Sequence, residues 1–175
     1  QTLKDLAGHS IAFQNPYSTS AYFLPAAQLL SDGLALELLL SPMDKPASDR
    51  VGYVFARTEL NITTWVHKRL VDVGVLSNLD WINPTRMPPT FAQDFRVIGR
   101  TPDVPRALML TRTGLAPNVQ ARLQEVLMEA ARDPDAGEAL RRFMKTAHFV
   151  PITDTDKQVL QQLGRDVRRV NTEVE

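Results

Sequence analysis

The alternation of short apolar segments with longer amphipathic segments is the feature that most restricts the fold of this chain. Strands are expected at residues 10–14, 51–56, 72–76, 95–99 and 106–111. Helices are expected at residues 19–32, 61–70, 117–131, 135–146 and 154–170. Because such alternation is typical of helices layered on a mostly parallel sheet, the chain is predicted to have an α/β fold and not a helical bundle or a β-sandwich.

A cluster of hydroxyl residues follows the first expected strand. The apolar strand at residues 11–13 runs into the turn Asn15-Pro16, after which Ser18, Thr19 and Ser20 open a helix. The first turn of a helix has free backbone N–H groups and the positive end of the dipole, and these hydroxyls add neutral donors. This order favours an oxyanion site. The alternative is that Ser18 or Ser20 only caps the helix.

A second polar segment, residues 77–81, follows the strand expected at 72–76. Ligands of open α/β sheets collect outside the carboxyl ends of the strands, so Asp80 is a candidate acceptor and Asn78 a candidate donor. The alternative is a turn, which these residue types also favour. One of Tyr17 and Tyr22, which flank the hydroxyls, and also Trp81 are candidates for cleft walls, or for ordinary core residues.

Composition excludes several classes of function. Twenty basic and twenty acidic residues give no net charge, which offers no electrostatic reason to expect a nucleic-acid partner. With no cysteine and three widely separated histidines, no metal site and no cofactor are expected. The sequence has no Walker, dinucleotide-binding or Gly-x-Ser-x-Gly motif, so we expect a binding protein and not an enzyme.

Several segments together resemble the phosphate/phosphite/phosphonate-binding periplasmic proteins of ABC transporters. The similar segments, in chain order, are residues 3–13, 15–20, 24–25, 71–81, 95–98 with Pro102 and Pro105, and 149–156. The resemblance implies a type 2 periplasmic-binding-protein fold with two lobes and a ligand cleft. It also implies a periplasmic or extracytoplasmic location.

The resemblance further implies a division of the chain. Relatives carry a first-lobe segment before the point that corresponds to Gln1. We therefore expect residues 1–101 to form a largely complete cleft-forming lobe, and residues 102–175 to supply the crossover and the C-terminal helices of the other lobe. A chain lacking that segment is expected to bind ligand weakly and to self-associate through exposed apolar surface.

The chain departs from the family pattern after the strand at 51–56. Many relatives carry a Gly-Ser-His-like segment there, whereas this chain has Arg57, Thr58 and Glu59. If Glu59 faces the cleft, it should repel a second anion and favour a ligand with a cationic end. Arg57 could offset this charge or grip an anion itself. By residue type alone, the default for Arg57 and Glu59 is a solvated pair, because Arg and Glu are mostly exposed.

The function implied by the resemblance is that of an extracytoplasmic solute-binding protein. Its ligand would be a small oxyanion, namely a phosphonate, phosphite or phosphate, bound by Tyr17, Ser18, Thr19, Ser20, Glu59, Asn78 and Asp80, and its partner would be an ABC permease. The alternative is the ligand-sensing ectodomain of a membrane-bound signalling protein, either a histidine kinase or a cyclase.

Overall fold

The computed structural model describes residues 2–174, which divide into two compact units. The first unit contains residues 2–102 and 162–174, and the second contains residues 103–161. Residues 162–174, which were expected to belong with residues 102–161, group with the first unit.

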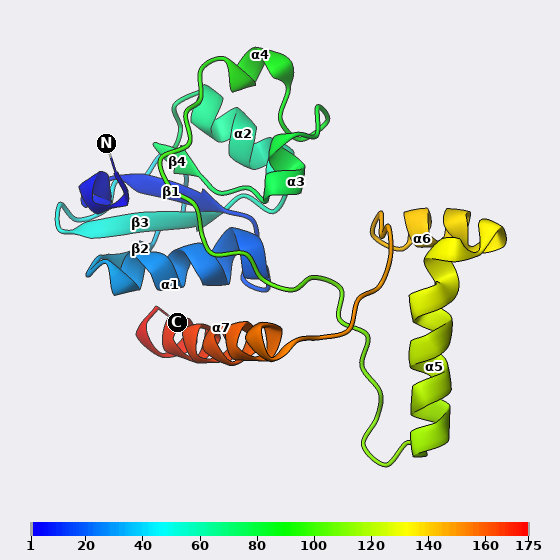
Figure 1. The fold of residues 1–175 in the computed structure, drawn as a ribbon. Coiled ribbons are helices and arrows are strands. Elements are labelled where there is room, and N and C mark those ends of the chain that lie inside the picture. Colours follow the sequence, from blue (N-terminus) through cyan, green and yellow to red (C-terminus); the bar gives the residue numbers. More distant parts are fainter. Residues whose placement is uncertain (1, 175) are drawn as a thin grey trace. The chain divides into compact units, whose positions relative to one another are not determined.

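A parallel four-stranded sheet forms the centre of the first unit (Figure 1). Its strands are β1 (Ser10–Phe13), β2 (Ala35–Leu38), β3 (Arg50–Phe55) and β4 (Val73–Gly74), in the spatial order β2-β3-β1-β4. The register pairs Ala12 with Val54 and with Gly74. The sheet and its helices confirm the predicted α/β fold.

Helices cover both faces of this sheet, since the strand side chains alternate between the faces. Residues Ile11 and Phe13 point toward the π-helical turn η2 (Thr19–Phe23) and helix α1 (Leu24–Ser31), where Tyr22 is fully buried. On the other face, Ala12 packs with helix α2 (Glu59–His67). Three short helices complete this part of the chain: η1 (Leu3–Leu6), α3 (Asn78–Trp81) and α4 (Pro89–Ala92).

The ends of these helices follow from local sequence. Gly33, at φ +83°, ends α1 as its position after the helix predicts, because glycine tolerates this left-handed conformation. Helix α2 begins earlier than expected: the Thr58 hydroxyl accepts the Asn61 N–H and caps the helix. Asn61 lies inside the helix, and its side-chain amide donates to the Ala56 carbonyl at 2.8 Å.

The last helix, α7 (Asp154–Glu173), packs its C-terminal part on the first unit. Val170 is fully buried in the core that contains α1. The Arg169 guanidinium donates to the Leu30 carbonyl and the Ser31 hydroxyl at the end of α1. These contacts explain why the C-terminal residues do not belong to the second unit.

The second unit consists of helical segments joined by extended chain. They are α5 (Pro117–Glu129), η3 (Ala130–Arg132), η4 (Pro134–Ala136), α6 (Gly137–Arg142) and the N-terminal part of α7. Leu140 is the one buried hydrophobic residue among those described in this unit. The apolar face of α5, formed by Val119, Leu123 and Val126, is exposed.

Two strand predictions were wrong. Residues 95–99 and 106–111 form no strand, and Leu110 is 84% exposed. An apolar run becomes a strand only when a neighbouring strand accepts its hydrogen bonds, and neither segment has such a neighbour among the described residues. Conversely, β2 forms because β3 lies beside it, although Glu37 interrupts its apolar pattern.

Candidate functional site

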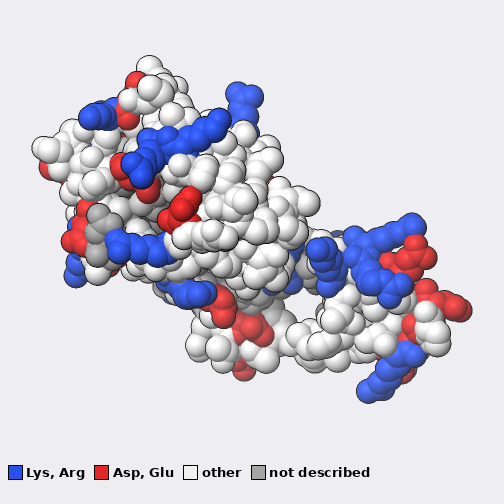
Figure 2. Space-filling model, turned by 90° about the horizontal axis from the view of Figure 1, so that it is seen from above, with Lys and Arg blue, Asp and Glu red and all other residues white. Residues whose placement is uncertain are grey.

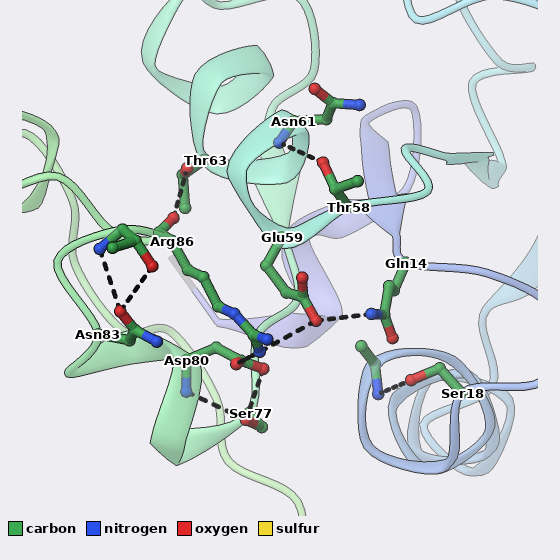
Figure 3. A network of polar contacts seen from close by, with 12 residues as sticks. Gln14, Ser18, Thr58, Glu59, Asn61, Thr63, Ser77, Asp80, Asn83 and Arg86 are labelled. Atoms are coloured by element: carbon green, nitrogen blue, oxygen red, sulfur yellow. Dashed lines mark hydrogen bonds and ion pairs between the residues drawn. The ribbon is translucent and has the colours of Figure 1, made fainter.

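The polar residues that follow β1, β3 and β4 gather at one edge of the sheet. These strands are parallel neighbours, so their carboxyl ends meet there. Gln14, directly after β1, connects the segments: its N–H donates to the Ala21 carbonyl, and its carbonyl accepts the Arg57 N–H at 2.7 Å. Figure 3 shows the side chains of this edge and the contacts between them.

The hydroxyl segment begins the helix that follows β1, as predicted. The Ser18 oxygen accepts the Ala21 N–H at 3.2 Å, so Ser18 caps η2. The Thr19 and Ser20 side chains are exposed and make no hydrogen bond within residues 2–174. The first turn contains no acidic residue. Tyr17 is 87% exposed and lies outside the core.

Glu59 lies within a polar cluster and is not a solvated surface residue. Only 15% of its side chain is exposed, and its carboxylate accepts the Gln14 amide at 2.6 Å. The same oxygen lies 3.3 Å from the Arg86 guanidinium. Arg57 does not offset the charge of Glu59: it is an exposed residue with φ +69°, and Arg86 is the cation that contacts Glu59.

Asp80 joins the same cluster from α3. Its side chain is 13% exposed; one carboxylate oxygen contacts the Arg86 guanidinium and the other accepts the Ser77 hydroxyl at 2.6 Å. The hydrogen bond from Asp80, followed by the charges of Asp80 and Glu59, raises the pKa of Arg86 above its ordinary value. Asn78, by contrast, is exposed and takes no part in this cluster.

The structure thus brings some of the predicted residues together. Glu59 and Asp80 both contact Arg86. The hydroxyl segment, residues 18–20, is followed by Ala21, whose carbonyl accepts the N–H of Gln14, the residue that also contacts Glu59. Sequence reasoning missed Gln14 and Arg86. The position of Gln14 immediately after β1 was an available signal, but Arg86 lies in a proline-containing loop with no pattern that marks it.

The surrounding surface has no dominant charge. Figure 2 shows basic and acidic side chains interspersed on the visible face, not gathered in one patch. Among residues 2–174 there is no cluster of side chains that could hold a metal ion. Within the same part of the chain, no helix combines the length and apolar composition needed to cross a membrane.

Polar side chains gather at the carboxyl edge of a parallel sheet, which is where proteins with open α/β sheets bind their ligands. The model of a family described as "ABC transporter, phosphonate, periplasmic substrate-binding protein" matches residues 1–157. The chain belongs to this family. Its members are transporter substrate-binding proteins and not enzymes, so the predictions of a periplasmic-binding-type fold, an extracytoplasmic location and a non-enzymatic class are confirmed at the level of the family.

Two solved structures of XAC2383 from Xanthomonas citri are similar to this chain. The one bound to chloride ion has 47% sequence identity and a TM-score of 0.91, and the one bound to ATP has 48% and 0.92. Each match covers 99% of this chain but only 62% and 63% of those chains, respectively. The chain therefore spans less than two thirds of the length of these relatives.

Proposed function

We propose that this chain is the ligand-binding part of a solute-binding protein that delivers a small oxyanion to an ABC permease. The oxyanion is a phosphonate, phosphite or phosphate. One observation carries the proposal: Thr19 and Ser20 expose unpaired hydroxyls at the start of a helix whose first turn contains no carboxylate. The family of the chain agrees with this role. No observation on the described residues favours the alternative role as a sensor ectodomain.

The chemistry of this segment suits an oxyanion. The Ser18 oxygen is already an acceptor for the Ala21 N–H, so its O–H remains available to donate outward. Neutral hydroxyl donors and the helix N-terminus stabilise an anion without a fixed positive charge. The related protein XAC2383 was solved with chloride and with ATP, which are both anions, and this supports an anion site here.

The remaining predicted residues have different roles in this proposal. Tyr17 lies directly before the hydroxyls and forms one wall of the site, while Asn78 donates from the start of α3. Glu59 and Asp80 follow β3 and β4, the two strands that flank β1 in the sheet, and in this proposal they face the part of the ligand that is not the oxyanion. Their position makes them determinants of selectivity, not of anion affinity.

Replacing Thr19 and Ser20 together by Ala tests the proposal. In the complete gene product we expect the affinity for methylphosphonate or inorganic phosphate to fall by about 2–4 kcal/mol, because two charge-assisted hydrogen bonds are lost. Isothermal titration calorimetry measures the loss, with chloride and ATP as further ligands. The matched control replaces Thr111 and Thr113, two exposed hydroxyls of the second unit, by Ala. Unchanged affinity in a folded double variant contradicts the proposal.

A further inference from the structure

Arg86 is the one cation that contacts both carboxylates of the polar cluster within the described residues. Its side chain is 44% exposed, whereas the Glu59 and Asp80 side chains that it contacts are 15% and 13% exposed. The two carboxylates come from different elements, α2 and α3 (Figure 3). Arg86 therefore connects the segments that follow β3 and β4.

The backbone of Arg86 is held as firmly as its side chain. The buried Thr63 hydroxyl of α2 donates to the Arg86 carbonyl at 2.8 Å. The Arg86 N–H donates to the Asn83 carbonyl at 3.0 Å, and the next residue, Met87, is buried. These contacts fix the backbone position of Arg86, and with it the place from which its guanidinium reaches the two carboxylates.

The charges of the cluster create a competition. Two carboxylates and one guanidinium leave a net charge of −1, so the cluster retains some preference for cations. The ammonium group of a ligand, however, competes with Arg86 for the two carboxylate oxygens that the guanidinium contacts, Oε1 of Glu59 and Oδ1 of Asp80. A ligand without a cationic group leaves Arg86 in place, and Arg86 then shields the oxyanion from Glu59 and Asp80.

We infer that Arg86 is an internal counter-ion that sets the selectivity of this site between plain oxyanions and oxyanions that carry an ammonium group. This inference rests on the proposed function, since it concerns the part of the same ligand that is not the oxyanion. It identifies Arg86 as a specificity-determining residue that acts through Glu59 and Asp80. The favoured ligand class of the unaltered protein is an oxyanion without a cationic group.

The test uses methylphosphonate and aminomethylphosphonate, which differ by a single ammonium group. In the complete gene product, Arg86→Gln should raise the ratio of aminomethylphosphonate affinity to methylphosphonate affinity by at least about tenfold, because two uncompensated carboxylates attract the ammonium and repel the phosphonate. Arg86→Lys, which keeps the charge, should leave the ratio near that of the unaltered protein. Arg122→Gln is the matched control, because it breaks an exposed ion pair with Glu125 on α5. An unchanged ratio in Arg86→Gln overturns the inference.

A second measurement separates this inference from the proposed function. In Arg86→Ala, millimolar methylguanidinium should refill the space between Glu59 and Asp80 and raise the melting temperature, while the unaltered protein and Arg122→Ala should not respond. If the unaltered protein binds neither phosphonate, the proposed function fails, and this rescue still decides whether Arg86 is the counter-ion. Absence of rescue overturns the assignment of Arg86 as the counter-ion.

Discussion

At the scale of single residues, Glu59 is largely buried and contacts Gln14 and Arg86, although glutamate usually lies exposed on the surface. In Glu59→Gln the cluster loses one negative charge while Arg86 remains paired with Asp80. We expect the affinity for inorganic phosphate to rise by roughly 3- to 10-fold, because a nearby repulsive charge is removed. A thermal-shift panel of phosphate, methylphosphonate and aminomethylphosphonate measures this. If the ranking of the three ligands does not change, Glu59 does not act on the ligand.

Thr63 fixes the loop that carries Arg86. Thr63→Val keeps the shape of the side chain but removes the donor to the Arg86 and Leu60 carbonyls. The free energy of unfolding should fall by about 1–3 kcal/mol, because both hydrogen bonds of the buried Thr63 hydroxyl are lost. Urea unfolding measures the difference, with Thr64→Val, one residue later in the same helix, as the control. Equal effects of the two changes would show that the Arg86 contact contributes nothing.

The residue scale also shows what sequence can and cannot predict about the site. The hydroxyls at residues 18–20 are local: strand, turn and helix start follow one another in ten residues, and the structure has the same order. Arg86 meets Glu59 across 27 positions of sequence. Such a contact depends on how α2 and the loop after α3 pack, and no residue spacing encodes it.

At the scale of elements, close packing limits which residues fit in the sheet. A Cβ atom at Gly52 in β3 would lie 2.7 Å from the Leu39 side chain and 2.8 Å from Pro46. Gly52→Ala should therefore destabilise the fold by about 1–3 kcal/mol through overpacking. Gly164→Ala, within α7, meets only the Arg168 side chain at 3.7 Å and should stabilise the helix by up to about 1 kcal/mol. Thermal unfolding of both variants tests this opposite pair of signs.

The helices that could be predicted are those whose own residues mark where they begin or end. Helix α1, with Gly33 behind it, and α5 lie close to their expected ranges. The strand predictions at 95–99 and 106–111 failed because apolar character alone does not supply a hydrogen-bonding neighbour. Strand β2 was missed for the complementary reason: its pairing with β3, and not its own pattern, makes it a strand.

At the scale of the whole molecule, several large apolar side chains of the second unit are exposed. Val119, Leu123 and Val126 lie on one face of α5, and Leu108, Met109 and Leu110 are also exposed. The 175-residue chain alone should therefore self-associate at micromolar concentrations. Sedimentation velocity measures this, and Leu123→Lys with Val126→Lys should shift the chain toward the monomer. A monomer at all concentrations before any substitution contradicts the prediction.

The Glu59–Arg86–Asp80 cluster is partly buried, and this limits how strongly salt can screen its charges. Mobile ions screen exposed charges over about 10 Å at 0.1 M salt, but they screen partly buried pairs much less. A periplasmic protein experiences the ionic strength of the surroundings of the cell. With both carboxylates less than one sixth exposed, discrimination between ligands should be nearly the same in dilute and in saline media, even where the rate of ligand capture changes.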